Sequence, residues 1–216
     1  MKERGMIFNG EMVRAILDGR KTQTRRIISE RHLNLIDLGS QIGECYPVEC
    51  GIDHENSQSY YREHCPFGKP GDRIWVRETY QGPLFDYEHM EAYLEDSSKF
   101  EKPDFCVYRA DGKPAPEFYD ADDNLHCCWR PSIHMPRWAS RILLEITDVR
   151  VERLASISQE DAAKEGYPAN PEPYGGSMDK WLWFRQLWDS IYPEQSFSHN
   201  PRVWVIEFKR VEGGAA

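Results

Sequence analysis

Residues 141–154, RILLEITDVRVERL, place Ile142, Leu144 and Ile146 at every second position. Because the side chains of a β-strand alternate between its two faces, this spacing predicts a long strand with one apolar face. Such a face must be buried against other elements, so the segment is expected to lie at the centre of the fold.

Two other segments have strand patterns. Residues 73–80 alternate with Ile74 and Val76 on one face, and residues 203–211 are apolar on much of both faces, as in a buried strand. These strands come from distant parts of the chain and are combined with helices. The pattern predicts an α+β fold, most economically a small mixed β-barrel with flanking helices.

Helix signals are local. Asn9 is expected to cap a short helix that stops at Gly19, and Ser158 to cap another that ends at Gly166. Residues 178–191 carry an apolar stripe at helical spacing, which predicts the longest helix. Residues 168–176 are expected to form a loop. Residues 29–70 show no dominant period, and we expect them to be irregular.

Length and composition are those of an ordinary globular protein. The chain has 216 residues, of which 29% are charged and 40% hydrophobic, which fits a single domain spanning residues 1–216. No apolar run approaches the roughly 20 residues that a membrane-spanning helix needs. We therefore expect a cytoplasmic protein with no membrane partner.

The net charge of −9 is unevenly distributed. Residues 84–126 contain twelve Asp and Glu against four Lys and Arg, whereas residues 14–31 contain six cations against two acids. The acidic, proline-bearing stretch at about 83–128 is expected to be an insertion that decorates the core. Charges are screened over about 8–10 Å, so a bound anion responds to the local balance.

The six cysteines show no regular spacing. We expect reduced thiols, because adjacent Cys127 and Cys128 fit poorly in a disulfide framework. Cys45, Cys50 and Cys65 lack the paired C-x-x-C spacing of a zinc site, so no bound metal is expected.

The first candidate site is residues 19–26, GRKTQTRR. Four cations within seven residues repel one another, and the neighbouring arginines favour the neutral form of Lys21. A neutral lysine near a hydroxyl can act as a general base, and Thr24 supplies a hydroxyl three residues on. The other interpretation is a solvated basic loop, because charge runs are usually exposed.

The second candidate site is residues 129–138, WRPSIHMPRW. Its two prolines exclude an α-helix and bias the backbone toward extended geometry. Two arginines, a histidine and flanking tryptophans suit phosphate contact combined with base stacking. The same residues fit equally an ordinary extended segment whose tryptophans lie in the core.

Glu165 falls in the last turn of the helix capped by Ser158. There the helix dipole disfavours a carboxylate by roughly a few tenths of a kcal/mol. An acid in this position fits a cationic partner such as Lys21 or Arg26, or it is simply exposed.

Four blocks follow one another along the chain: residues 19–26 (GRKTQTRR), 71–78 (GDRIWVRE), 154–166 (LASISQEDAAKEG) and 204–208 (WVIEF). Together they resemble the ASCH domain family of the PUA-like superfold. Residues 129–141 resemble the longer ASCH relatives carried by phages and prophages. The resemblance covers most of the chain outside residues 29–65 and 83–128.

The resemblance implies a small β-barrel with a cleft that recognises RNA or a nucleoside. Small bacterial ASCH proteins that deacetylate N-acetylated cytidine use a Lys, a Thr three residues later and a Glu. Carried over, Thr24 is the nucleophile, Lys21 its base, and Glu165 the residue that orients and charges Lys21. Arg26 would steady the developing oxyanion. The additional residues 83–128 and 129–141 distinguish this chain from those small enzymes.

Three functions fit the implied cleft: hydrolysis of the amide of N-acetylated cytidine, non-catalytic RNA binding, and RNA cleavage with His134 as acid or base. A fold does not choose between them. The common partner is RNA or a modified nucleoside, without a cofactor, and protein partners are left open. The predicted binding residues are Arg20, Arg25, Arg26, Trp129, Arg130, Ser132, His134 and Arg137.

Overall fold

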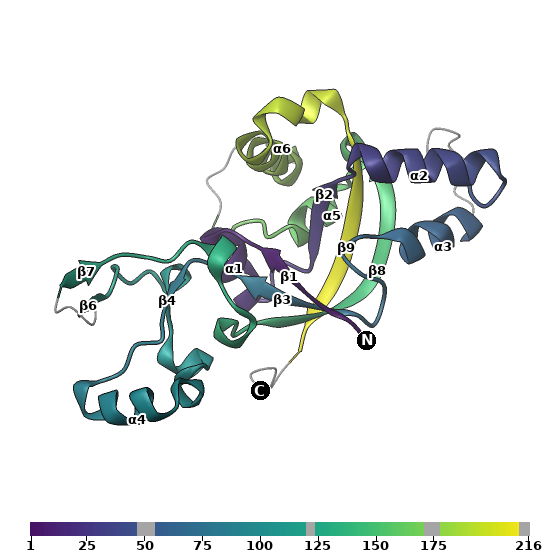
Figure 1. Cartoon of the computed structure of the whole chain (residues 1–216). Helices are drawn as coiled ribbons and strands as arrows, with labels where there is room; N and C mark the ends of the chain where they lie inside the picture. The colour runs from purple at the N-terminus through teal and green to yellow at the C-terminus, as the bar shows by residue number, and fades with distance from the viewer. Residues whose placement is uncertain (47–54, 120–123, 171–177, 212–216) are drawn as a thin grey trace. The chain divides into compact units, whose positions relative to one another are not determined.

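The computed structural model describes residues 1–46, 55–119, 124–170 and 178–211 (Figure 1). The chain forms two compact units. The first unit contains Met1–Lys2, Asp18–Asp72 and Glu145–Lys209, and the second contains Glu3–Leu17, Arg73–Leu144 and Arg210–Ala216. Each unit is therefore assembled from separate stretches of sequence. A single domain over residues 1–216 stays a prediction.

The second unit contains a parallel strand pair. β1 (Glu3–Ile7) pairs with β3 (Arg73–Arg77), with Gly5 opposite Trp75. A Cβ atom on Gly5 would lie 2.6 Å from the Trp75 ring, so the indole needs glycine at this position. Ile74 and Val76 are buried on one face of β3, which confirms the strand predicted there.

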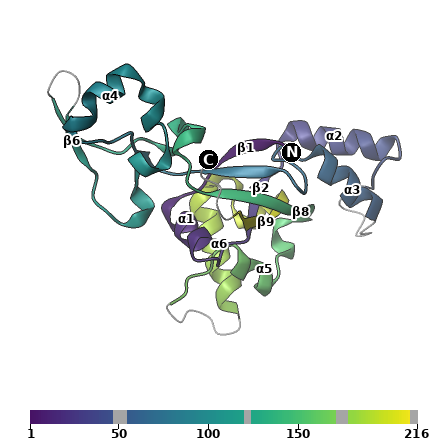
Figure 2. The same ribbon diagram turned by 90° about the horizontal axis from the view of Figure 1, so that it is seen from below.

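The first unit contains an antiparallel pair, β2 (Gln23–Ile27) and β9 (Arg202–Arg210). β8 (Leu143–Arg153) lies next to β9 and confirms the predicted long strand. Its first two residues, Leu143 and Leu144, belong to the second unit and the others to the first. β8 and β9 run side by side in both views (Figures 1 and 2).

The sheet is open, and the predicted closed barrel was wrong. Hydrogen bonds connect five strands in the order β1-β3-β8-β9-β2, and the two end strands do not close the order into a ring. Four short strands that could have extended the sheet pair with one another instead. They are β4 (Tyr80–Gln81) with β5 (Val107–Tyr108), and β6 (Glu117–Tyr119) with β7 (Leu125–Cys127). Closure would require β1 and β2 to pair, and in the described part of the chain they do not.

Two helices of the first unit cover β9 with apolar side chains. α5 (Gln159–Lys164) begins at Ser158, whose hydroxyl accepts a hydrogen bond from the Asp161 amide at 3.0 Å, as predicted. α6 (Asp179–Ile191) buries Phe184 and Trp188 in a cluster that includes Val203 and Val205 of β9. None of the helices in the described part of the chain combines the length and apolar character that a membrane crossing requires.

Residues 29–70 are not irregular as expected. They contain α2 (Glu30–Gln41) and α3 (Glu55–His64). α2 buries only Ile36 and Gly39 and leaves its other apolar side chains at least partly exposed, so no apolar stripe marks it in the sequence. A Cβ atom on Gly39 would lie 2.7 Å from Tyr60 of α3. The two helices therefore depend on a close contact that periodicity does not report.

The second unit also holds the acidic stretch and the proline-bearing segment. Within residues 83–128 the chain forms α4 (Met90–Glu95), several 3₁₀ turns and the short strands β5, β6 and β7. In the proline-bearing segment, Ser132–His134 and Arg137–Ala139 are single 3₁₀ turns that each follow a proline. The exclusion of an α-helix is confirmed there. The predicted loop at 168–176 lies mostly outside the described residues.

Removal of the α5 cap tests the local reasoning. Ser158→Ala deletes the acceptor for the Asp161 amide, and we expect the free energy of unfolding to fall by about 1 kcal/mol. Urea denaturation measures this loss. Ser156→Ala, an exposed serine of the preceding turn, should change stability by less than about 0.5 kcal/mol. Equal effects of the two changes would show that the cap does not stabilise α5.

Candidate functional site

Lys21 lies immediately before β2 and forms an isolated antiparallel bridge with Glu165, the residue after α5. Its Nζ donates hydrogen bonds to the Glu165 carboxylate at 2.7 Å and to the Glu165 carbonyl at 2.9 Å. The two side chains are 0% and 3% exposed. The strand and the end of the helix are thus joined by a buried ion pair, and Glu165 has the cationic partner that its position suggested.

Burial lowers the pKa of Lys21 below its ordinary value. The charge of Glu165 and its hydrogen bond act in the opposite direction, while the charges of Arg25 and Arg26 lower the pKa further. Desolvation penalises the ammonium form, and an adjacent carboxylate offsets that penalty only in part. Lys21 therefore loses its proton more readily than an exposed lysine.

Arg25 holds the second oxygen of Glu165. Its guanidinium donates to Glu165 Oε1 at 3.0 Å and also lies 3.3 Å from Glu152 and 3.6 Å from Asp161. The side chain is 1% exposed, and its guanidinium carbon lies 5.7 Å from the centre of the Phe184 ring. Arg25 is almost fully buried among three carboxylates, and its predicted role in binding stays a prediction.

A second layer of polar side chains surrounds this pair. The Gln23 amide donates to Asp161 at 2.9 Å and to Glu207 at 2.8 Å. Arg150 forms ion pairs with Glu152, Asp161 and Glu207. Burial acts to raise the pKa of Asp161, but the bond from Gln23 and the charges of Arg25 and Arg150 produce a net lowering.

The whole network carries balanced charge. It comprises four cations, Lys21, Arg25, Arg150 and Lys164, and four acids, Glu152, Asp161, Glu165 and Glu207. With Lys21 protonated and the acids ionised, four positive and four negative charges leave a formal charge of zero. Asp161 and Glu207 belong to the sequence blocks quoted above. Nothing in the sequence marked Arg150 and Glu152 as site residues, because charged residues on a strand are ordinarily solvated.

Thr24 and Arg26 form a separate pair. Successive side chains of a strand point to opposite faces, so Thr24 and Arg26 share a face of β2 that Gln23 and Arg25 do not. Thr24 is fully buried, and its hydroxyl accepts a hydrogen bond from Arg26 at 2.9 Å. Among the described residues, no hydrogen bond joins Lys21 to Thr24.

Arg20 has a structural contact. Its guanidinium donates to the carbonyls of Gly166 at 3.2 Å and Tyr167 at 2.9 Å, and it pairs with Asp18. Carbonyls at a helix end lack intrahelical donors, and a cation there is favourable. Arg20 therefore ties the chain after α5 to the turn before β2.

The other predicted binding residues lie in the second unit. The backbone of Arg130 bridges Tyr80, while the side chains of Arg130 and His134 are exposed. Arg137 pairs with Glu3 at 3.0 Å. Trp129 is half-buried, and Trp138 packs against the cluster of Tyr80, Tyr108, Met135 and Ala139. The segment is anchored by Trp138 and Met135 and presents Arg130 and His134 to solvent.

Ser132 lines a cavity of about 510 Å³ together with Glu78, Thr79, Arg14 and Arg109. Glu78 is 1% exposed, and both of its oxygens accept from Arg141, at 2.9 and 3.0 Å. Burial raises the pKa of Glu78, and the bonds from Arg141 oppose that rise. Sequence reasoning did not include Glu78 among the candidate site residues. A carboxylate directly after a strand with a buried face is the feature of the sequence that could have identified it.

The thiols considered for zinc are only partly within the described residues. Cys45 and Cys65 are buried, and the Cys45 thiol donates to the carbonyl of Ile36 at 3.5 Å. Cys50 lies outside the residues that the structure describes. The absence of a metal stays a prediction.

Comparison with known proteins gives limited information. No family model matches the chain, and no curated protein matches it. Among solved structures, an ASCH domain from Lactobacillus crispatus JV V101 is similar, with 12% sequence identity over 97% of this chain and 79% of that chain. The TM-score is 0.40, which is too low to establish a shared fold.

Breaking the buried pair should be costly. Glu165→Ala leaves Lys21 and part of Arg25 buried without the carboxylate that neutralises them, and we expect the free energy of unfolding to fall by about 3–5 kcal/mol. Glu160→Ala, which removes an exposed acid from the same helix, should cost less than about 0.5 kcal/mol.

Chemical denaturation compares both variants with the Lys21→Met/Glu165→Leu double variant. The double variant removes both charges, so it should recover much of the loss. A Glu165→Ala loss no larger than that of Glu160→Ala would contradict a buried, mutually dependent pair.

Proposed function

We propose that this chain recognises RNA or a modified nucleoside and hydrolyses the amide of N-acetylated cytidine with Lys21, Thr24 and Glu165. The observation that carries the proposal is the sealed Lys21–Glu165 pair, in which burial lowers the lysine pKa. A titratable group shifted by desolvation and held by one specific charge partner is typical of an acid–base site. The resemblance of the sequence blocks to the ASCH family supplies the substrate class.

The proposed reaction has two steps. The Thr24 hydroxyl oxygen attacks the acetyl carbon while its proton passes to neutral Lys21. The carbon–nitrogen bond then breaks, and the exocyclic amine leaves with the proton that Lys21 returns. Water hydrolyses the acetyl ester on Thr24, which releases acetate. Proton transfer requires Lys21 and Thr24 to come within hydrogen-bond distance in the substrate complex. Catalytic hydrogen bonds often shorten only when the substrate binds.

Two arginines take different roles in this scheme. Arg25 fixes the oxygen of Glu165 that does not contact Lys21, so it positions the base without touching substrate. Arg26 donates to the Thr24 hydroxyl. After attack, the same guanidinium is placed to stabilise the oxyanion that develops beside Thr24.

Non-catalytic RNA binding is the second candidate function. It is favoured by the exposure of Arg130 and His134 on a segment whose backbone is anchored. Exposed arginine and histidine side chains on a firmly held segment can donate hydrogen bonds to phosphate. The buried network of the first unit adds little to such binding, because its own acids neutralise its cations. RNA cleavage by His134 stays a prediction.

Variants of the catalytic set test the hydrolase. Thr24→Ala should abolish release of acetate from N-acetylated cytidine while leaving binding largely intact, because it removes the nucleophile. Lys21→Ala should lose activity by a comparable factor, since base and nucleophile act as one unit. Thr22→Ala provides the matched control, because that hydroxyl is two residues away and outside the set. Mass spectrometry of the nucleoside product measures turnover.

Two results would contradict this mechanism. One is full activity of Thr24→Ala, which would leave water as the nucleophile. The other is no turnover by the unaltered chain on any acylated nucleoside together with retained RNA binding, which would favour the second candidate.

The pH dependence of turnover follows from the Lys21 pKa. The base must be neutral to accept a proton, so activity should rise as pH increases through the pKa of Lys21. Because burial lowers that pKa, the midpoint should lie below 10.5. A rate profile that falls over the same range, with the fold retained by circular dichroism, would exclude neutral Lys21 as the base.

Binding through residues 129–138 is tested by salt dependence. Arg130→Ala and Arg137→Ala should each weaken binding of a short RNA and reduce the slope of log K against log salt by about one unit, because each phosphate contact releases roughly one counterion. Lys113→Ala, an exposed cation elsewhere in the second unit, should leave the slope unchanged. If the Arg130/Arg137 double variant binds like the unaltered chain at about 50–200 mM salt, the segment is scaffold.

A further inference from the structure

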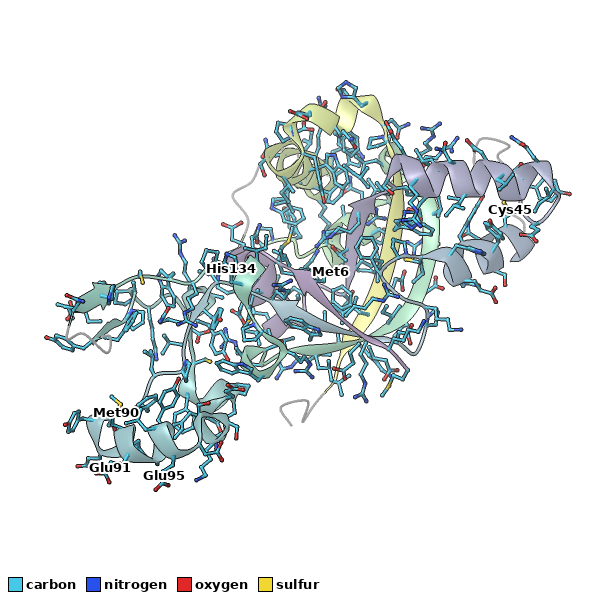
Figure 3. All side chains as sticks on the ribbon, in the orientation of Figure 1. Met6, Cys45, Met90, Glu91, Glu95 and His134 are labelled. Carbon is cyan, nitrogen blue, oxygen red and sulfur yellow. The ribbon has the colours of Figure 1, made fainter. Side chains whose placement is uncertain are left out.

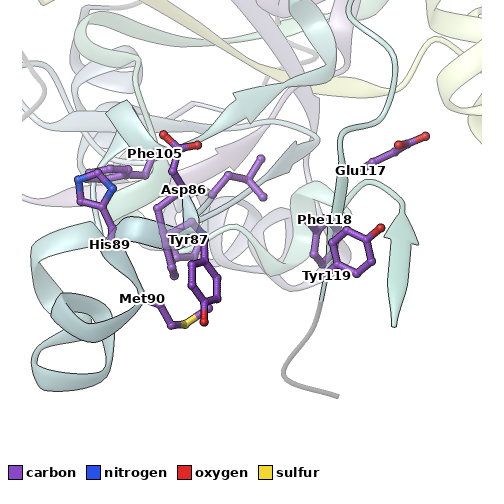
Figure 4. Close-up of a pocket in the computed structure, with 11 residues that line it drawn as sticks. Asp86, Tyr87, His89, Met90, Phe105, Glu117, Phe118 and Tyr119 are labelled. Atoms are coloured by element: carbon purple, nitrogen blue, oxygen red, sulfur yellow. The ribbon is translucent and has the colours of Figure 1, made fainter. Parts of the chain in front are cut away.

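The second unit contains a cavity of about 670 Å³ whose walls are mainly aromatic. Tyr87 and Met90 lie on one side and Phe118 and Tyr119 on the other (Figure 4). Asp86 and Glu117 also line the cavity. A pocket of this size is within the range that binds ligands or inserted side chains.

The walls are held in place by ring contacts. Phe85, Phe100 and Phe105 form a chain of rings with centroids 4.9 and 4.8 Å apart, and Phe100 is buried. On the opposite wall, Phe118 stacks on His126 across the β6–β7 ladder at 5.4 Å. Although polar in sequence, residues 83–128 therefore build a small aromatic cluster. The cavity has a defined shape because of it.

Two acids line the cavity, Asp86 and Glu117, and one cation, Lys102, lies 5.3 Å from the centre of the ring of the lining residue Phe105. In the described part of the chain, neither Asp86 nor Glu117 makes an ion pair or a side-chain hydrogen bond. Glu91 and Glu95 project away from α4 (Figure 3). Carboxylates without an ion-pair partner attract a cation that approaches from solution.

Large apolar side chains at and beside the cavity are exposed. Tyr87 is 88% exposed, Tyr119 68% and Leu94 76%. Exposed apolar groups gathered with charged neighbours are typical of protein interaction surfaces. The same acidic charge disfavours a nucleic acid, whose phosphates would be repelled.

We propose that this cavity docks a basic, amphipathic segment of a partner protein. A Lys or Arg side chain of that segment enters between Tyr87 and Tyr119, with its methylene stem against the rings. Asp86 and Glu117, one on each side of the cavity, attract the basic side chains of the segment. Cations bind favourably over aromatic faces, and long basic side chains pack their apolar stems while keeping the charge near polar groups. The neighbouring apolar residues of the partner cover Met90 and Leu94.

The proposal assigns the acidic stretch a role that is independent of hydrolysis or RNA binding. Charge complementarity with the acids requires a positively charged partner. The apolar rim selects a protein segment over a small polyamine, because a polyamine cannot cover Tyr119 or Leu94 with apolar side chains.

Fluorescence anisotropy with the full chain tests it. The probe is a fluorescein-labelled peptide of alternating lysine and leucine, and its counterpart has glutamate in place of lysine. We expect the lysine peptide to bind and the glutamate peptide not to bind. Asp86→Asn/Glu117→Gln should weaken binding about ten-fold, which corresponds to two modest charge pairs.

Matched controls separate the cavity from general attraction. Glu101→Gln/Asp104→Asn removes the same net charge outside the cavity lining, and its dissociation constant should stay within about two-fold of the unaltered value. Tyr119→Ala should weaken binding, whereas Leu125→Ala, its cross-strand neighbour on β7, should not. All four positions with altered charge are at the surface or partly exposed, and circular dichroism verifies that each variant is folded.

Several outcomes would overturn the proposal. Equal weakening by the two charge-removing double variants would indicate non-specific electrostatic attraction. Complete displacement of the peptide by spermine at equal positive charge would indicate a small-cation site. Equally tight binding of the glutamate and lysine peptides would show that charge does not select the partner. If neither peptide binds, the cavity is not a docking site for such a segment.

Discussion

The first unit depends on the two buried ion pairs of the Glu165 carboxylate. One oxygen accepts from Lys21 and the other from Arg25, and all three side chains are almost fully buried. The backbone joins the same elements, because Lys21 bridges Glu165 and the Thr22 amide donates to the Lys164 carbonyl. Burying two cations is tolerable only when they are paired and hydrogen-bonded. The junction between β2 and the end of α5 is therefore held by buried ion pairs and by backbone hydrogen bonds at the same place.

This pairing changes the meaning of the cation-rich sequence at residues 19–26. Its repelling charges are gathered because Glu152 of β8, Asp161 of α5 and Glu165 after α5 pair with them. Arg20 donates to carbonyls at the end of a helix. Few of these cations remain for a polyanion. A buried lysine with a lowered pKa suits proton transfer better than phosphate attraction, which is why acid–base chemistry is proposed for the network.

The net charge of −9 does not show how differently the acids are used in the two units. Four acids of the first unit, Glu152, Asp161, Glu165 and Glu207, pair with Arg25 or Arg150. The acids that line the cavity of the second unit, Asp86 and Glu117, have no such partner among the described residues. The two sets therefore differ in consequence. Paired acids fix the positions of buried cations within the unit, and unpaired acids are available to groups that approach from solution.

The sequence by itself determined the features that local spacing controls. Alternation of Ile142, Leu144 and Ile146 identified β8, and Ser158 identified the start of α5, because strand faces and helix caps depend on residues a few positions apart. Only the tertiary structure decided that α2 and α3 exist, that the sheet stays open, and that Arg25 faces three carboxylates. Each of these depends on contacts between distant residues, such as Gly39 with Tyr60 and Arg25 with Glu165. Their free energy comes from packing and desolvation that one-dimensional spacing does not encode.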